Sequence, residues 1–513
     1  MNRSKILLLS SFFFILGVGT ANLIKLPLFE AYFLLIIFVV ILFLNKSSAS
    51  LYIKANRKII LNHSPLQQSY RVFRKLLNKK KLSLYYLIIF FICFLFGALR
   101  YDLAISKETS FHKQKKVILN GLITEEPETR EKYSELIVKD NLSKDKILLK
   151  TNYYPQYFYG DEIKIKCQPK LIDKNSSYGK YLTKNKIKFI CYYPEITLQS
   201  QNNGNKFYAK ILRFKQKSKS IITRALPDPE SEILSAIILG YKKEIPADWR
   251  AKFSQVGISH IVAISGMHLA IISFILLYIL ISFGIWRQKA FYITIVFLWL
   301  FIIMIGFPAS AFRAGIMISL IMWAQYLGRT NNLITVLSLT ASFLLIINPL
   351  FLFGDVGFQL SFLAILGIIY LSPIFKKWFK NIPDFYELKK ILIITLSAQT
   401  MTLPLAVYHF GNIPFLSLPV NLIAVPLLPI ILSLGIILIF LGFVSIKLAI
   451  IAGWIVWAIL NIFLKIVNFF VFLPFSHFYL EKINFLIILL IYILIIVGVY
   501  YWNKNNKFEM FFN

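Results

Sequence analysis

The feature that most constrains this chain is a series of long apolar runs, each close to the length that a lipid bilayer requires. A helix needs roughly 20 apolar residues to cross a hydrocarbon core about 30 Å thick. About twelve such runs occur, near residues 6–24, 28–44, 84–99, 261–285, 290–306, 309–327, 333–347, 355–371, 391–408, 420–444, 448–473 and 483–502. With 57% hydrophobic residues, the chain cannot bury this surface in a water-soluble core. The sequence therefore predicts a polytopic α-helical membrane protein of about 11–12 spans.

Basic residues in the loops indicate the orientation, because cytoplasmic loops carry an excess of Lys and Arg. Residues 45–83 contain ten basic residues and no acid, so this loop and the N-terminus beside it are expected in the cytoplasm. Counting spans from there places further basic stretches inside, which are Arg287 with Lys289, Arg329, "KKWFK" and Lys447. The same count places residues 101–260 outside. The first run lacks a clear cleavage site and is expected to stay as an anchor.

The external segment has a different composition. Short β-rich runs such as "VILNGLITEEP" and "GDEIKIKCQPKLI" are separated by turn residues. Five such strands predict a small all-β domain of OB type inserted after the third span, with a sandwich as the alternative. Cys167 and Cys191 lie on its strands, in a compartment where disulfides persist. We expect them to be bonded, and two buried thiols are the alternative.

A basic amphipathic helix is predicted over residues 205–225, after the β domain. Its basic residues recur at steps of three and four or their sum, and they are Lys206, Lys210, Arg213, Lys217 and Arg224. Phe207 and Phe214 lie beside this stripe. The net charge of +33 suits anionic neighbours, which can be lipid headgroups or nucleic acid. A helix in the headgroup layer and a track for a phosphate backbone both stay open.

Polar residues gather in the outer halves of five predicted spans. They are Ser265, Gly266, His268, Ser310, Arg313, Asp355, Gln359, Gln399, Thr402 and Asn421. Hydrogen bonds between helices are the ordinary explanation for Ser, Thr, Gln and Asn, whereas ionisable residues in a span favour function. We expect a polar outer vestibule, with a mutual Arg313–Asp355 ion pair as the alternative for those two. On one helix, His260 and His268 would lie about 12 Å apart, too far to share a metal ion, and no cofactor is expected.

At these residues the chain resembles the ComEC family of inner-membrane channels for natural DNA uptake. Four blocks in order carry the resemblance, and they are "GISHIVAISGMHLAII" (257–272), "GFPASAFRAGIM" (306–317), "GDVGFQLSFLAILGI" (354–368) and "SAQTMTLPLAVYHFGNIPFLSLPVNLIAVPLLP" (397–429). Upstream, "AIILGYKKEIP" is similar to a further family block, although Tyr241 and Lys242 stand where an acidic residue is usual. "YGDEIKIKCQPK" resembles the external OB-like domain of the family.

The resemblance implies a non-enzymatic channel that translocates single-stranded DNA into the cytoplasm during natural transformation. It implies the inner membrane and its lipids as surroundings, an external DNA-receptor protein, and a cytosolic ATP-driven translocase. This chain has no G-x-x-x-x-G-K-[ST] stretch of its own for ATP. Many members end in a nuclease domain with a His-x-His-x-Asp-His cluster, which this sequence lacks, so a separate nuclease is expected. A homo-oligomer stays open.

The expected organisation has five parts. They are an anchor (1–100), the external OB-like domain (101–204), the basic helix and linker (205–256), the transmembrane channel domain (257–502) and a cytoplasmic tail (503–513). Two other functions stay open. One is a polytopic enzyme or transporter for a lipid-linked or small anionic substrate, with His268 and Asp355 as an acid–base pair. The other is a remnant channel that no longer transports DNA.

Overall fold

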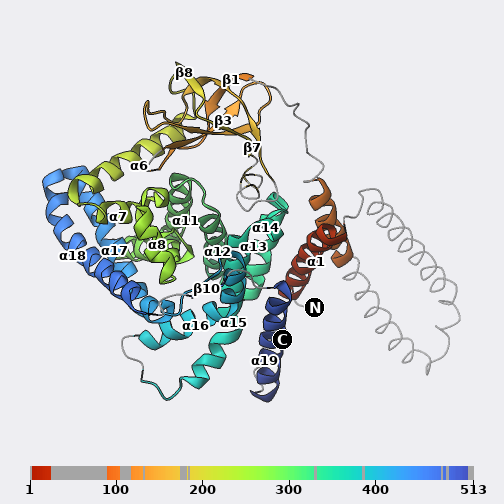
Figure 1. Cartoon of the computed structure of the whole chain (residues 1–513). Helices are drawn as coiled ribbons and strands as arrows, with labels where there is room; N and C mark the ends of the chain where they lie inside the picture. The colour runs from red at the N-terminus through yellow and green to blue at the C-terminus, as the bar shows by residue number, and fades with distance from the viewer. Residues whose placement is uncertain are drawn as a thin grey trace, which may run out of the picture. The chain divides into compact units, whose positions relative to one another are not determined.

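The computed structural model describes residues 3–24, 89–103, 117–130, 133–173, 187–328, 332–383, 387–474, 478–480 and 484–506, with residues 179, 182 and 185. The expected span near 28–44 and the basic loop 45–83 lie outside the described residues. The chain forms two units. Figure 1 shows its helices and strands with their labels. The first unit comprises Met1–Phe111 with Asn331–Phe353, and the second comprises His112–Thr330 with Gly354–Phe511.

Helices make up most of the described chain. They are α1 Arg3–Ile24, α6 Lys206–Ala225, α7 Glu230–Leu239, the 3-10 helix η1 Lys242–Glu244, α8 Ala247–Gln255, α9 Ser259–Val262, α10 Gly266–Ser282, α11 Arg287–Met304, α12 Ala309–Tyr326, α13 Leu333–Ile347, α14 Phe351–Gly354, α15 Val356–Trp378, α16 Leu388–Phe410, α17 Ser417–Val444, α18 Ile446–Phe472 and α19 Phe485–Asn506. Among the described residues, seven helices are long and apolar enough to cross a membrane, namely α1, α11 and α15 to α19. Helices α10 and α13 are apolar but shorter. The class of polytopic membrane protein is confirmed, while the count of about 11–12 spans stays a prediction.

The first unit pairs N-terminal helices with α13. Arg100, in the helical stretch 89–103, donates from Nε to the Ile346 carbonyl at 2.7 Å and from Nη2 to the Ile347 carbonyl at 2.8 Å. These bonds satisfy carbonyls at the end of α13 that lack partners within the helix. The structure therefore groups α13 with the N-terminal helices in one unit, and the expected five-part organisation of the chain stays a prediction.

An eight-stranded sheet forms the β domain of the second unit. Its strands are β1 Val117–Ile123, β2 Glu128–Thr129, β3 Ser134–Asp140, β4 Lys146–Thr151, β5 Glu162–Cys167, β6 Lys170–Leu171, β7 Ile187–Tyr192 and β8 Glu195–Ser200. The order is β6-β7-β4-β3-β1-β5-β8, with β2 paired to β3, and the β4–β7 pair alone runs parallel within this sheet. Leu136, Leu149 and Ile163 are fully buried in its core. The β domain is confirmed, and its OB type stays a prediction.

The disulfide Cys167–Cys191 joins β5 to β7, which are not neighbours in the sheet order. The Cα atoms of the two cysteines are 6.0 Å apart. In the sheet order, β4, β3 and β1 lie between β7 and β5. The disulfide therefore connects two strands that do not pair with each other in the described sheet.

Helix α6 forms where the amphipathic pattern predicts it. The Asn205 side chain caps its start by accepting hydrogen bonds from the backbone N–H groups of Phe207 and Tyr208, at 2.9 and 3.3 Å. Its buried side includes Leu212 and Ile222. Together with α7, which is almost wholly buried, this side joins the main hydrophobic core of the membrane helices.

Candidate functional site

The chain breaks within the run that the sequence predicts as one span over 261–285. Helix α9 ends at Val262, and α10 begins at Gly266. Ala263 and Ser265 adopt extended backbone conformations between the two helices. The run is therefore not one continuous helix, so the helical estimate of about 12 Å between His260 and His268 does not apply to this structure.

Ser265 and His268 form a capping box at the start of α10. The Ser265 Oγ lies 3.0 Å from His268 Nδ1, and the Ser265 backbone N–H donates to the same nitrogen at 3.3 Å. These contacts satisfy donor groups that the helix start leaves without partners. The ring is fully buried, and its Nε2 has no hydrogen-bond partner among the described residues.

Helix α12 holds the extended break in place. Ser310 Oγ donates to the carbonyl of Ile264, in the break, at 2.8 Å. The side chain thereby satisfies a carbonyl that no helix uses. At Gly266 the two helices approach so closely that an added Cβ would lie 3.3 Å from the Ala314 Cβ. The blocks "AISG" and "PASAFRA" thus fit together through a hydrogen bond and a close contact.

An ion pair joins α12 to the start of α15. Arg313 Nη1 lies 3.6 Å from Asp355 Oδ2, with side-chain exposures of 6% and 11%. Asp355 also caps α15 by accepting the backbone N–H of Gly357 at 3.0 Å. The Arg313 Nε has no partner among the described residues. Of the two interpretations of this pair, the structure shows the ion pair.

We call Ser265, His268, Ser310, Arg313 and Asp355 the N-terminal cluster, because they lie in the first turns or cap positions of α10, α12 and α15. Helix N-termini carry partial positive charge from unpaired N–H groups. These helix N-termini and the Arg313 guanidinium together favour a negatively charged group nearby. Within the protein, the Asp355 carboxylate is that group. This chemistry suits binding of an anion such as phosphate. Among the described residues, no group of three or more His, Cys, Asp or Glu could hold a metal ion.

Three other vestibule candidates, Gln399, Thr402 and Asn421, lie on helices α16 and α17, outside the N-terminal cluster. Gln399 Nε2 donates to the Ser417 Oγ at 3.0 Å, which joins α16 to the first residue of α17. Thr402 donates within its own helix to the Ala398 carbonyl at 2.9 Å. Asn421 is buried, and its Oδ1 has no partner among the described residues.

Gln359 lies one turn into α15 and is half-buried. Gln399 lies near the middle of α16, which spans Leu388–Phe410, and the expectation that it shares one depth with the other polar residues stays a prediction. A single vestibule that includes both this group and the N-terminal cluster stays a prediction.

The basic stripe lies on the exposed side of α6. Its five residues are all exposed, and none pairs with an acid among the described residues; they are Lys206, Lys210, Arg213, Lys217 and Arg224. Phe207 and Phe214 beside them are exposed too. The stripe is therefore available to an anionic surface or polymer.

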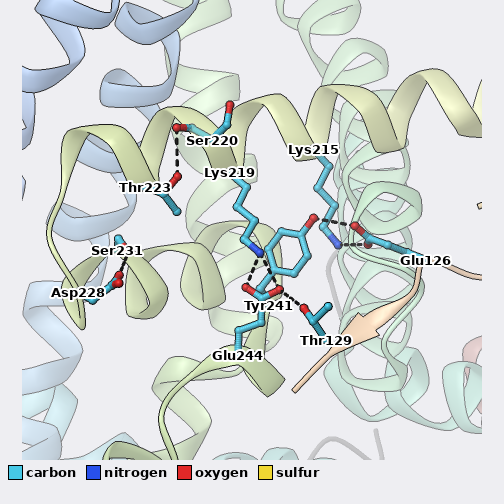
Figure 2. Close-up of polar contacts among 10 residues, drawn as sticks. All are labelled: Glu126, Thr129, Lys215, Lys219, Ser220, Thr223, Asp228, Ser231, Tyr241 and Glu244. Atoms are coloured by element: carbon cyan, nitrogen blue, oxygen red, sulfur yellow. Dashed lines mark hydrogen bonds and ion pairs between the residues drawn. The ribbon is translucent and has the colours of Figure 1, made fainter. Parts of the chain in front are cut away.

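A buried polar network, missed from the sequence, joins α6 to the β domain (Figure 2). Lys215 Nζ lies 2.6 Å from Glu126 Oε2, with side-chain exposures of 4% and 15%. Tyr241 donates its hydroxyl to Glu126 Oε1 at 2.6 Å, and the Lys215 ammonium lies 4.2 Å from the centre of its ring. Burial, followed by the Glu126 carboxylate, raises the pKa of Tyr241 far above its usual value.

The same network continues through Glu244 of η1. Its carboxylate pairs with Lys219 of α6 at 2.6 Å and accepts the Thr129 hydroxyl at 2.9 Å (Figure 2). Nearby, Lys243 lies 3.0 Å from Glu135 on β3. We call Glu126, Thr129, Lys215, Lys219, Tyr241 and Glu244 the docking network. Lys215 lies on the buried side of the amphipathic helix α6. Because lysine is rarely buried without a partner, its position in the sequence pattern is the one signal that predicts a buried acidic partner.

Contacts of α6 contradict one part of the charge-based orientation. Phe214 stacks on Phe443, near the end of α17, with ring centres 5.1 Å apart, and Lys217 lies 5.0 Å from the same ring. The sequence places α6 outside and Lys447, only four residues after Phe443, in the cytoplasm. Because a bilayer core is about 30 Å thick, these neighbouring groups cannot lie on opposite faces. One Lys is a weak orientation signal.

Comparison with known proteins agrees with the sequence blocks. The model of the family described as Competence protein matches residues 237–505, which is more than half of the 513-residue chain. "ComE operon protein 3" of Bacillus subtilis (strain 168) is 29% identical over 249 residues, covering 48% of this chain and 31% of that relative. The match thus spans less than a third of the relative's length. No solved structure matches the chain. The chain belongs to the competence protein family, as the resemblance predicts.

Proposed function

We propose that this protein is a channel of the inner membrane that passes single-stranded DNA into the cytoplasm during competence. The main observation behind the proposal is the buried Arg313–Asp355 pair near the N-terminal ends of α12 and α15. Ionisable groups inside a membrane protein are costly and generally mark a pathway for a polar substrate. Family membership supports DNA as that substrate.

The N-terminal cluster supports the proposal by its chemistry. Arg313 can form paired hydrogen bonds with a phosphate, as guanidinium groups commonly do. Asp355 neutralises the same guanidinium when no phosphate is present, which limits the cost of burying it. In the proposed cycle, successive phosphates replace Asp355 as the partner of Arg313, and each leaves when the carboxylate returns.

The basic stripe of α6 has a supporting role in the proposal. Its exposed side chains raise the local concentration of an anionic polymer by electrostatic attraction. The same side chains suit acidic lipid headgroups, with Phe207 and Phe214 entering the apolar layer beside them. Both roles stay within the proposal, because a stripe of this kind can bind a headgroup at one end and a strand at the other.

The proposed setting is the inner membrane, with a cytoplasmic N-terminus and an external β domain. The α17–α18 turn then lies on the external side with α6, in contrast to the orientation expected from Lys447. External capture of DNA and ATP-driven pulling belong to other proteins in this proposal, as does degradation of the second strand. The partners are a DNA receptor, a cytosolic translocase and a nuclease.

Uptake of labelled DNA tests the proposal. Cells with and without the chain receive the DNA, and label is measured separately at the cell surface and in the nuclease-protected cytosol. We expect deletion to abolish cytosolic label while surface label stays unchanged. Unchanged cytosolic label would contradict the proposal. If the double variant His268→Gln/Asp355→Asn takes up DNA normally but loses flux of a small anion or lipid-linked substrate, the transporter alternative is favoured.

A further inference from the structure

An exposed group of tyrosines lies at one edge of the β domain. Tyr153 and Tyr154 follow the end of β4, and Tyr192 and Tyr193 lie at the end of β7. All four are exposed, with Tyr154 at 71% and Tyr193 at 61%. Exposed aromatic rings in this number have no role in the core of the domain, so they point to a binding surface.

The parallel pairing of β4 and β7 brings these residues together. The carboxyl ends of parallel strands meet at the same edge of a sheet, and Lys150 is the register partner of Tyr192. The Tyr193 backbone N–H donates to the Lys150 carbonyl at 2.7 Å, three residues before Tyr153. Tyr153 and Tyr154 have ring centres 4.8 Å apart. The two pairs of tyrosines therefore lie at the same edge of the sheet, and we treat them as one patch.

Basic side chains lie among the rings. The Lys150 ammonium is 5.6 Å and the Lys170 ammonium 5.3 Å from the centre of the Tyr192 ring. Lys150 also lies 3.9 Å from the buried Glu135, whereas Lys170 is exposed. The disulfide holds Cys191, the residue before Tyr192, and thereby fixes one side of the patch.

We propose that this patch, which we call the tyrosine patch, binds single-stranded DNA by base stacking. Unpaired bases stack on aromatic rings without sequence preference, and lysines between the rings contact the phosphates. Duplex DNA keeps its bases stacked inside the helix and cannot use the rings in this way. The inference rests on the proposed function for its choice of DNA, but it concerns a separate surface.

Binding of a fluorescent oligo-dT strand to the purified full-length chain in detergent tests the patch by fluorescence anisotropy. Each base–aromatic stack contributes on the order of 1–3 kcal/mol, so we expect Tyr154→Ala and Tyr193→Ala each to weaken binding about fivefold or more. Tyr154→Phe and Tyr193→Phe keep the rings and should bind like the parent. Lys170→Gln should lower the salt dependence of binding, because one phosphate contact is lost.

Matched controls separate this inference from general damage and from the proposed function. Tyr500 and Tyr501 form another exposed neighbouring pair, so Tyr500→Ala/Tyr501→Ala should leave oligo-dT binding unchanged. Equal affinity for duplex DNA, or unchanged oligo-dT binding in the alanine variants, would overturn the stacking proposal. If those variants bind oligo-dT normally yet lose uptake, the patch serves a protein partner and the proposal is also overturned. A different outcome separates the two proposals. If the alanine variants weaken oligo-dT binding as expected, but deletion of the protein leaves DNA uptake unchanged, the channel function alone is rejected.

Discussion

Lys215 and Glu126 lie 2.6 Å apart between α6 and the β domain, largely withdrawn from water. Removing one partner of such a pair leaves a buried charge without compensation, which generally costs about 3–5 kcal/mol. We expect Glu126→Gln to destabilise the docked β domain by roughly 3 kcal/mol. Thermal unfolding and limited proteolysis of the detergent-solubilised protein measure the change.

An exposed pair on the same domain provides the matched control. Lys166 and Glu195 lie 3.1 Å apart, with side-chain exposures of 50% and 77%. Glu195→Gln should cost less than about 1 kcal/mol, because solvent screens exposed pairs. Equal effects of Glu126→Gln and Glu195→Gln would show that the docking network does not hold the domain in place.

Tyr208 of α6, whose pKa is affected by Glu126 of the docking network, predicts an alkaline loss of stability. Burial, and then the Glu126 and Glu125 carboxylates, raise the pKa of Tyr208 from 10.0 to about 12. A raised pKa favours the neutral phenol in the folded state, so its stabilising contribution is complete below pH 10 and is lost as the pH rises through about 12. We expect the unfolding temperature to fall more steeply over this interval in the parent than in Tyr208→Phe. Identical slopes would argue against the shift.

The disulfide prediction concerns β5 and β7. We expect Cys167→Ser to slow migration on a non-reducing gel, since the unbonded chain is less compact when denatured. Stability of the β domain should fall by about 3 kcal/mol, the usual effect of a loop of this order of length. Cys93→Ser is the matched control, because Cys93 is a free cysteine. A mobility identical to that of the parent in both variants would count against the bond.

The close approach of α10 and α12 makes a prediction at Gly266. An added Cβ would lie 3.3 Å from the Ala314 Cβ, so Gly266→Ala should shift the helices and destabilise the protein by about 1 kcal/mol. Because glycine inside a helix itself costs about 1 kcal/mol relative to alanine, the test compares backgrounds: Gly266→Ala should cost less stability in the Ala314→Gly protein than in the parent. An equal cost in both backgrounds would show that another contact at Gly266 matters.

Much of the architecture follows from the sequence, because long apolar runs, an amphipathic repeat and alternating strands each have one clear physical solution. The break at residues 263–265 does not follow from the sequence, because the residues on both sides are apolar and continue the pattern expected for a single helix. Its cause is tertiary: Ser310, 46 positions along the chain, satisfies the freed Ile264 carbonyl. The "SG" dipeptide was the local sign of a helix start.

The sequence predicts which residues belong to the candidate site better than it predicts which of them contact each other. Arg313 and Asp355 were marked by their cost in a membrane, and the ion pair was one of two readings. The docking network was missed because Glu126 and Tyr241 are 115 positions apart and neither belongs to a charge run. Lys447 conflicts with the contacts of α6 because a single lysine carries little information about orientation.

Photo-crosslinking during uptake tests the central claim most directly. A photoreactive amino acid at position 357, which is exposed beside Arg313, should capture labelled DNA in transit. The same amino acid in place of Leu490, on the exposed apolar surface of α19, is the matched control and should capture none. Crosslinks at 357 and not at 490 are the result predicted for a DNA passage at the N-terminal cluster. Active uptake with no crosslink at 357, or with equal crosslinking at both positions, would contradict it.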